Sequence, residues 1–391
     1  MQLSNTNPSY PPTTRFYSRK KILFSTIIEI VAAIILLPAM LFKKSKSNVK
    51  RILLMEPFQM GDIMSLTPLI DPLMRKYPES KIDVFTKTGG GSVLEYDSRI
   101  NKVFTTDIPW SDHGTKKITW KRLYSTFKFA FKLRKYNYDI GIDTRGDVRS
   151  QALLLLAGCR TRVGYLNYLH SNMNVMGMLL THKKEKSIYK HRYLWNVDIL
   201  TAIGFSEDEL FPIKFPGFIP DKLLPAAGKL SNSTVIHIGG GWKYRLWSEQ
   251  KWAELINYLQ NKNNDPIFVI GGSGESEALK RIEVQTAKTG QVKFMTTSLS
   301  EMVSLIGSCS LFVGLDSGPM NIASCLNIKT IALFGPGDVA MWQPINEHGR
   351  FIQKAEKFPC SPCLQIQCIY PLKNCMSEIS VEDVIDKINH S

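Results

Sequence analysis

Residues 311–336 alternate between patterns typical of buried strands and patterns typical of turns, and few folds are compatible with this order. Leu311–Leu315 is an apolar run with the length of a buried parallel strand, and a helix then begins at Asp316–Pro319. A second apolar run, Thr330–Phe334, ends at a turn that starts with Gly335. A strand, a helix and a second strand in this order predict a βαβ unit, whose two strands end at the same edge of a parallel sheet.

The two turns of this unit have the residue types of an anion-binding site. Asp316, Ser317 and Gly318 lie where the helix begins, and the free N–H groups of a helix N-terminus attract anions. Gly335 opens the second turn at the same edge. We expect a nucleotide diphosphate to bind there. The alternative is that the polar side chains only cap the helix and the glycines only make turns.

The first half of the chain also reads as α/β. Arg51–Glu56 has a buried-strand pattern, a helix is expected from Ser65 to Met74, and Lys81–Thr86 is the next strand. The loop between the first strand and this helix carries Asp62. A carboxylate at a strand end can accept a proton from a substrate hydroxyl, and it can equally serve as a helix cap.

A second α/β set opens at Thr234–Ile238, after a proline-rich linker at Phe211–Pro225. The turn that follows this strand contains Lys243 and Arg245, two cations that could neutralise a diphosphate. A glycine-rich turn farther along ends at Glu275, which could accept hydrogen bonds from a ribose or cap the next helix.

These motifs resemble those of glycosyltransferase family 9, the heptosyltransferase family. The 316–321 run and the turn at Gly335 resemble its donor-binding signature, although Asn321 stands where the family has a histidine. The loop with Asp62 resembles the family's opening motif, and the likeness extends from about Lys50 to Ile388. It implies two Rossmann-like domains that face each other across a cleft, the GT-B arrangement. Their expected bounds are 49–216 for the acceptor domain and 217–391 for the nucleotide-sugar domain.

The resemblance also implies roles for particular residues. Asp62 is expected to be the catalytic base. The donor site is expected to contain Lys243, Arg245, Glu275, Asp316, Ser317, Gly318, Asn321 and Gly335. An acidic glycolipid acceptor is expected to meet four arginines of the first half, Arg145, Arg149, Arg160 and Arg162, although these could simply form a solvated rim. No cofactor and no catalytic metal are expected.

The N-terminal segment is unusually basic and apolar. The chain has a net charge of +15, and its first 51 residues contain nine Lys or Arg against one acid, Glu29. Ile22–Phe42 is long enough for a helix that spans a bilayer or lies in its interface, although Glu29 and Pro38 disfavour a simple span. Residues 1–48 are therefore expected to be a leader and a membrane-associated helix, with a cleaved signal peptide or a buried helix as alternatives. An anionic membrane surface is the expected partner, and no nucleic-acid motif is present.

Four cysteines near the C-terminus, Cys360, Cys363, Cys368 and Cys375, are spaced more widely than the ligands of most structural zinc sites. These four cysteines could bind a metal, remain reduced structural thiols or form disulfides, and the sequence does not decide among the three roles. Three further cysteines lie singly within apolar segments, which favours a reducing compartment.

The function that these features predict is an inverting glycosyltransferase at the cytoplasmic face of the bacterial inner membrane. It would move heptose, or a related sugar, from a nucleotide sugar such as ADP-heptose to a lipopolysaccharide-core or lipid-linked acceptor. A family member that uses another nucleotide sugar for cell-surface glycans is one alternative, and a non-catalytic membrane-tethered binder is another. A dehydrogenase is disfavoured, because no strand leads into a well-formed Gly-x-Gly-x-x-Gly turn.

Overall fold

The computed structural model describes residues 48–390 except for 112–116, 167–176, 186, 188, 215–216, 222, 224–231, 242, 288, 361–367 and 371–372, together with the isolated positions 27, 30 and 34. Apart from those three positions, the predicted membrane-associated helix Ile22–Phe42 lies outside the described residues. No helix within the described ranges is both long and apolar enough to cross a bilayer.

The first lobe is built on a six-stranded parallel sheet with the order β3-β2-β1-β4-β5-β6. Its strands are β1 (Arg51–Glu56), β2 (Lys81–Lys87), β3 (Ile100–Thr106), β4 (Ile140–Asp143), β5 (Thr161–Tyr165) and β6 (His182–Lys184). Its α-helices are α2 (Met60–Met64), α3 (Ile70–Lys76), α4 (Trp120–Lys132), α5 (Val148–Leu156), α6 (Arg192–Asp198) and α7 (Glu207–Leu210).

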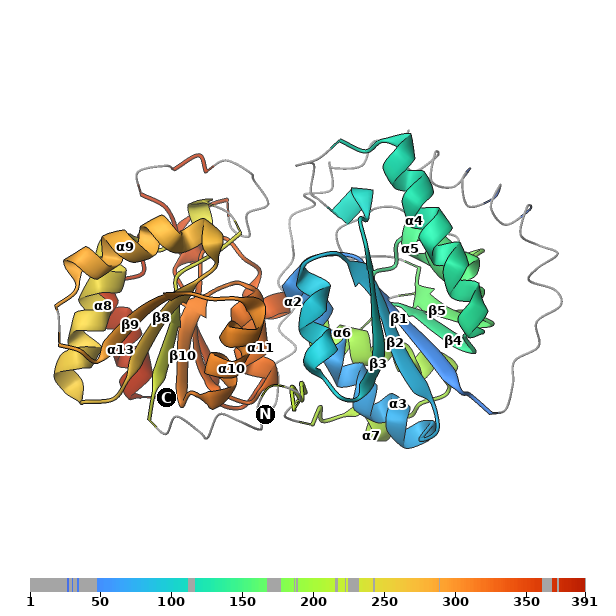
Figure 1. Ribbon diagram of the computed structural model, residues 1–391, viewed down its shortest axis with the longest axis horizontal. Helices are drawn as coiled ribbons and strands as arrows, with labels where there is room; N and C mark the ends of the chain where they lie inside the picture. Colours follow the sequence, from blue (N-terminus) through green and yellow to red (C-terminus); the bar gives the residue numbers. More distant parts are fainter. Residues whose placement is uncertain are drawn as a thin grey trace.

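The second lobe repeats this plan in the order β12-β11-β10-β7-β8-β9, again entirely parallel. Its strands are β7 (Thr234–His237), β8 (Ile267–Gly271), β9 (Val292–Thr296), β10 (Leu311–Leu315), β11 (Lys329–Phe334) and β12 (Gly349–Gln353). Its α-helices are α8 (Glu249–Lys262), α9 (Ser276–Gln285), α10 (Leu299–Ser308), α11 (Gly318–Cys325), α12 (Val339–Trp342) and α13 (Val381–Asn389). The two lobes lie side by side in Figure 1. This arrangement confirms the prediction of two parallel α/β domains.

The helix expected from Ser65 to Met74 is interrupted. Its residues form a 3₁₀ turn at Thr67–Leu69 followed by α3, and the stretch before it, which was predicted as a loop, forms the short helix α2 with Asp62 inside it. Pro68 lies within the 3₁₀ turn, and proline has no N–H to donate to a continuous α-helix. The short α2 at the end of β1 is therefore a separate element and does not continue into α3.

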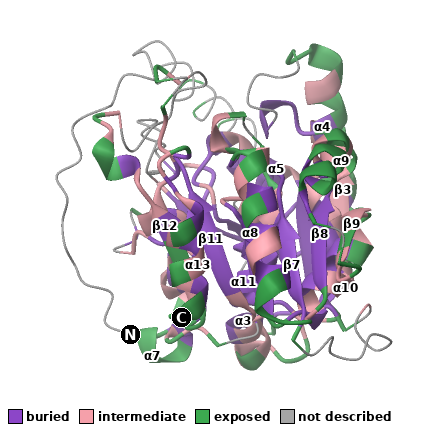
Figure 2. Cartoon of the chain, turned by 90° about the vertical axis from the view of Figure 1, so that its left-hand side faces the viewer, coloured by how far each residue is buried: buried purple, intermediate pink, exposed green. Residues whose placement is uncertain are grey.

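The described residues form three apolar clusters. One lies between the first sheet and α4 and α5, and another lies between the second sheet and α8, α9 and α13. Figure 2 shows the second sheet as buried strands with exposed residues on the outer sides of α8 and α13. The third and largest cluster joins the inner faces of both sheets through α2, α3, α6, α10 and α11. Since this cluster is shared, the lobes are packed against each other and not merely linked.

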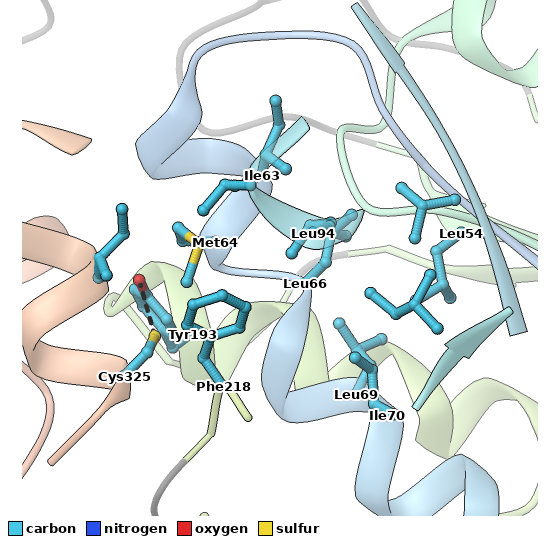
Figure 3. Close-up of a cluster of buried hydrophobic side chains, with 14 of the residues drawn as sticks. Leu54, Ile63, Met64, Leu66, Leu69, Ile70, Leu94, Tyr193, Phe218 and Cys325 are labelled. Atoms are coloured by element: carbon cyan, nitrogen blue, oxygen red, sulfur yellow. Dashed lines mark hydrogen bonds between the residues drawn. The ribbon is translucent and has the colours of Figure 1, made fainter. Parts of the chain in front are cut away.

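The closest approach between the lobes is between α2 and α11, which meet in the middle of Figure 1. A Cβ at Gly318 would lie 2.7 Å from the Met60 sulfur, and a Cβ at Gly61 would lie 3.0 Å from the Asn321 amide nitrogen. Glycine at both positions lets the two helices touch. Figure 3 shows Tyr193 of α6 reaching the Cys325 thiol of α11 just below this contact.

Candidate active site

The candidate residues occupy corresponding places in the two lobes. In each sheet the strand order reverses at one pair of neighbouring strands, β1 and β4 in the first and β7 and β10 in the second. Open α/β sheets bind ligands at this reversal, just beyond the carboxyl ends of the strands. Asp62 follows β1 and Arg145 follows β4, whereas Arg245 follows β7 and Asp316 follows β10. Four loops that are far apart in the sequence therefore supply one pair of side chains to each reversal.

Asp62 and Arg145 meet at the reversal in the first sheet. Arg145 Nη1 donates to Asp62 Oδ1 at 2.8 Å, and each side chain is 14% exposed. The guanidinium also lies over the Phe58 ring, 3.8 Å from its centroid. The other oxygen of Asp62 accepts the Gln59 N–H at 3.3 Å, which closes the first turn of α2. The same carboxylate thus caps its helix and faces the site.

Glu56, the last residue of β1, lies fully buried beside this pair. Its Oε2 accepts from Arg192 Nη2 at 2.8 Å and from Thr144 Oγ1 at 3.0 Å. Its Oε1 lies 3.9 Å from Arg145 Nη1. Burial raises the pKa of Glu56, and the positive charges of Arg145 and Arg192 oppose that rise. The negative charge of Asp62 adds to the rise. The side chains therefore form a row of alternating charge, which begins at the buried Arg192 and continues through Glu56 and Arg145 to Asp62.

The loop that presents Arg145 is folded around the Asp143 carboxylate. This buried carboxylate accepts three backbone N–H groups, from Arg145 at 3.0 Å, Gly146 at 3.1 Å and Asp147 at 3.2 Å. Burial raises the pKa of Asp143 to about 7, against the effect of the Arg145 N–H bond. Because three consecutive N–H groups converge on one carboxyl, the turn after β4 has a single shape and a fixed direction for the Arg145 side chain.

Arg245 and Asp316 form the equivalent pair in the second lobe. Arg245 Nη1 lies 3.0 Å from Asp316 Oδ2. Burial raises the pKa of Asp316, and the charge of Arg245 opposes this shift. The charge of Asp62 in the first lobe raises the pKa of Asp316 as well. Because α2, which contains Asp62, packs against α11, which follows Asp316, both carboxylates lie at the boundary between the lobes. Lys243 shares the 3₁₀ turn of Arg245.

The other predicted donor residues make contacts close to their own turns. Glu275, which follows β8, accepts the Gly272 N–H at 2.9 Å and so closes its own turn. The Ser317 hydroxyl donates to the Leu315 carbonyl at 3.0 Å, so it is turned away from the first N–H groups of α11. The Gly335 carbonyl accepts from Gln353 Nε2 at 2.9 Å. All three lie just after strands of the second sheet, at its carboxyl edge, while their binding roles stay predictions.

Asn321 lies at the lobe boundary, and it is only 4% exposed. Its amide oxygen accepts from the Tyr193 hydroxyl at 3.0 Å, and its amide nitrogen donates to the Ser317 carbonyl at 2.9 Å. The Cys325 thiol in turn donates to the Tyr193 hydroxyl at 3.4 Å. The amide therefore connects α11 to α6, while donor binding by Asn321 stays a prediction.

The four predicted acceptor arginines do not gather at one place. Arg145 contacts Asp62, and Arg149 pairs with Asp147 and stacks on the Trp110 ring at the same edge of the sheet. Arg160 precedes β5 and Arg162 lies early in this strand, so both are at the opposite, amino-terminal part of the sheet. Arg160 lies 3.7 Å from Asp139, and the buried Arg162 donates to the Leu179 and Cys159 carbonyls. These last two arginines bind the fold together and are not brought to the site.

The cysteine-rich tail is only partly described. Cys363 lies outside the described residues, and Cys360, Cys368 and Cys375 are all partly exposed. Within the described ranges, no three His, Cys, Asp or Glu side chains are grouped so that they could hold a metal ion.

Sequence reasoning missed two residues of the site, Glu56 and Arg192. An acid at the end of an otherwise apolar strand was a usable signal for Glu56, since strand ends carry the sites of parallel sheets. Nothing in the local sequence distinguishes Arg192 from a surface arginine. Its burial is decided only when α6 packs below the β1–β4 edge.

Two Rossmann-like lobes that share one site, with a carboxylate on the first and a paired arginine and a helix N-terminus on the second, define a glycosyltransferase with a GT-B-like fold. The sequence model of glycosyltransferase family 9 (heptosyltransferase) matches residues 126–373. This chain belongs to that family, as its motifs predicted.

Similar proteins extend over most of the chain. Lipopolysaccharide heptosyltransferase 3 of Escherichia coli K12 is 23% identical over 300 residues, which are 74% of this chain and 83% of that protein. Lipooligosaccharide heptosyltransferase 2 of Campylobacter jejuni is 24% identical over 349 residues, 85% of this chain and 96% of that protein. The E. coli heptosyltransferase WaaC has been solved with ADP, and it matches the fold with a TM-score of 0.68 at 17% identity, over 87% of this chain and 99% of WaaC. WaaC with ADP-2-deoxy-2-fluoro heptose matches with a TM-score of 0.67 at 19% identity, over 87% and 99%.

Proposed function

We propose that this protein transfers heptose from ADP-heptose to a lipopolysaccharide-core or lipid-linked acceptor, with inversion at the anomeric carbon. The observation that carries the proposal is the packing of α2, which contains Asp62, against α11, which begins just after the Asp316 that pairs with Arg245. In this arrangement Asp62 would accept the proton, and the turn with Lys243 and Arg245 would bind the diphosphate. The donor is supported by similar proteins named as heptosyltransferases and by the ADP-containing complexes of WaaC.

In this proposal the acceptor hydroxyl attacks the anomeric carbon in a single displacement. Asp62 takes the hydroxyl proton as the new carbon–oxygen bond forms. The bond from the anomeric carbon to the diphosphate oxygen breaks at the same time, and ADP leaves with that electron pair. Arg245, Lys243 and the N-terminus of α11 offset the negative charge of the leaving diphosphate. Arg245 would exchange part of its contact with Asp316 for the phosphate oxygens.

The proposed location is the cytoplasmic face of the bacterial inner membrane, because nucleotide sugars are made in the cytoplasm and the acceptor is a lipid. The basic, apolar N-terminal segment supports this location. Of the four arginines that were expected to hold an acidic acceptor, Arg145 and Arg149 support this part of the proposal, because both follow β4 at the carboxyl edge of the first sheet.

Asp62→Asn tests the catalytic part of the proposal. We expect turnover to fall by about 10²–10⁴-fold, because a general base contributes that much, while ADP affinity changes by less than about twofold. Asp386→Asn is a matched control, since Asp386 is an exposed residue of α13 in the second lobe. Near-normal turnover by Asp62→Asn would remove this residue from the role of base.

The nucleotide is tested by calorimetric titration of the intact protein with ADP, UDP, GDP and NAD. The proposal requires ADP to bind most tightly. Tighter binding of UDP or GDP would keep the glycosyltransferase and change the donor, as the exchange of the family histidine for Asn321 allows. Selective binding of NAD would contradict the assignment of the second lobe to a nucleotide sugar.

A further inference from the structure

Helix α4 carries large aromatic side chains on its solvent face. Trp120 is 87% exposed, Tyr124 is 67% exposed and Phe131 is 56% exposed. Ile118, just before the helix, is 57% exposed. At about 100° per residue, Trp120, Tyr124 and Phe131 fall within about 40° of one another around the helix axis. They form one apolar stripe along the outside of the first lobe.

Four lysines form a second stripe directly beside the aromatic one. Lys121, Lys128 and Lys132 are exposed and follow the same helical spacing, and Lys135 is exposed on the 3₁₀ turn that follows α4. No Asp or Glu occurs in the sequence between Asp112 and Asp139. Within the described ranges, none of these four lysines forms an ion pair. The charge of this face is therefore positive and not neutralised by neighbouring acids.

The exposed aromatic residues are not needed for the core, because α4 has a different face for that purpose. Thr126 and Ala130 are buried against the first lobe, and Phe129 packs against Phe85 and Phe104. This inner face covers the outer side of the first sheet beside α5 (Figure 1). The helix is thus anchored from within, while Trp120 and its neighbours contribute little to folding.

The start of α4 lies at the same edge of the sheet as the candidate active site. The turn before it, Pro109–Ser111, follows β3 at the carboxyl ends of the strands. The Ser111 carbonyl accepts from Gln59 Nε2 at 3.3 Å, and Trp110 stacks on Arg149 at 5.3 Å. A surface bound through Trp120 would therefore lie near the start of α2, the helix that contains Asp62.

We propose that the outer face of α4 is a docking surface for an anionic lipid bilayer. Aromatic side chains partition into the interfacial region of a bilayer, and a row of lysines beside them pairs with acidic headgroups. A membrane-parallel helix needs such a division into one apolar and one cationic stripe, whereas a merely solvated helix face would not expose an indole almost completely. This surface consists of residues 118–135, and the proposal is independent of the sugar and nucleotide proposed above.

Quenching of Trp120 fluorescence tests the proposal in the full-length protein. The seven tryptophans all lie at or after Trp110, so the N-terminal segment adds no signal. Vesicles of brominated phosphatidylglycerol should quench the wild type clearly more than Trp120→Phe, which keeps an aromatic side chain but removes this fluorophore. Equal quenching of the two proteins would overturn the proposal. Equal quenching of the wild type by brominated zwitterionic phosphatidylcholine would overturn its electrostatic part.

A charge variant tests the lysine stripe. Lys121→Gln, Lys128→Gln, Lys132→Gln and Lys135→Gln together should bring quenching close to the level of Trp120→Phe, because each lysine near an anionic surface contributes about fivefold in binding. The matched control makes the same change at four exposed lysines of the second lobe, Lys262, Lys280, Lys293 and Lys357. Unchanged quenching in the control supports the α4 surface. A loss as large as that of the α4 variant would show that only net charge matters and would overturn the assignment to α4.

Discussion

At the scale of single residues, Asp62 is held by a side chain that is itself fixed from within the lobe. Arg145 contacts Asp62 on one side and lies near the buried Glu56 on the other, and Arg192 neutralises Glu56 from below. A buried ion pair with additional hydrogen bonds keeps its geometry, because breaking it leaves a buried charge unpaired. We infer that Arg145 positions Asp62 more than it binds the acceptor.

Arg145→Gln separates these two roles. If Arg145 positions Asp62, kcat should fall by up to about 10²-fold, since small misplacements of a reacting group cost that much, and the KM for acceptor should change little. Steady-state kinetics with varied acceptor measures both constants. Arg160→Gln is the control, because Arg160 lies at the opposite end of the sheet, and it should leave both constants unchanged. A raised KM with an unaltered kcat would assign Arg145 to acceptor binding instead.

At the scale of elements, the contact of α11 with α2 and α6 decides where the two halves of the site meet. Tyr193 donates to the buried Asn321 oxygen and accepts from Cys325, so its hydroxyl bonds twice to α11. Gly61 and Gly318 allow the close packing above it. A shift of α11 would move Asp316 relative to Asp62.

Tyr193→Phe tests this link. The Asn321 amide oxygen would be left buried without its partner, so the free energy of unfolding should fall by about 1–3 kcal/mol in urea denaturation. Tyr124→Phe, which loses a hydroxyl from an exposed ring, should change it by less than about 0.5 kcal/mol. Replacing both partners, in Tyr193→Phe with Asn321→Leu, should recover part of the loss. If the single variant is as stable as the wild type, the hydroxyl does not connect the lobes.

At the scale of the whole molecule, a neutral histidine lies in the boundary between the lobes. His191 Nδ1 accepts the Tyr193 N–H, and Nε2 lies 2.8 Å from the Gln343 carbonyl of the second lobe. With Nδ1 used as an acceptor, the proton belongs on Nε2, which can then donate to that carbonyl. Burial lowers the pKa of His191 to about 4. The same cause lowers the pKa of His237, within the second lobe, to about 4.

The lobe contact should therefore weaken in acid. Between pH 6.5 and 4 the unfolded chain binds protons that the folded imidazoles do not, so the free energy of unfolding falls as the pH drops through this range, by about 3 kcal/mol for each histidine. His191→Asn can still accept the Tyr193 N–H but carries no titrating ring. Urea unfolding at pH 7 and at pH 4.5 should show a smaller pH difference for this variant than for the wild type.

The control for the pH experiment is His348→Asn, since the His348 side chain is 53% exposed and pairs with Glu347 of its own lobe. Its pH difference should equal that of the wild type. If His191→Asn also keeps the full pH difference, the acid sensitivity of the protein does not come from the lobe boundary.

The two parallel α/β domains could be predicted from the sequence, because each strand and turn has a recognisable local residue pattern. Apolar runs such as Leu311–Leu315 can only be buried on both faces, and the polar turns that follow them must lie at strand ends. Asp62, Arg245 and Asp316 were placed correctly at the carboxyl edges for this reason. The helix after Asp62 was predicted as continuous, because apolar spacing does not reveal the break that Pro68 causes.

Which charges meet was decided only by the tertiary structure. In the sequence, Arg145, Arg160 and Arg162 are similar basic residues near the strands β4 and β5. Because Arg160 and Arg162 lie at the start of β5, they are at the amino-terminal end of the sheet, whereas Arg145 follows β4 at the carboxyl end. Glu56 and Arg192 are far apart in the sequence, and only the packing of α6 brings them into one buried pair. By itself the sequence determined the two lobes and the loops that face a ligand, since periodicity and turn chemistry are local. The pairing of residues across those loops depends on strand order and lobe packing, and these depend on contacts between distant segments.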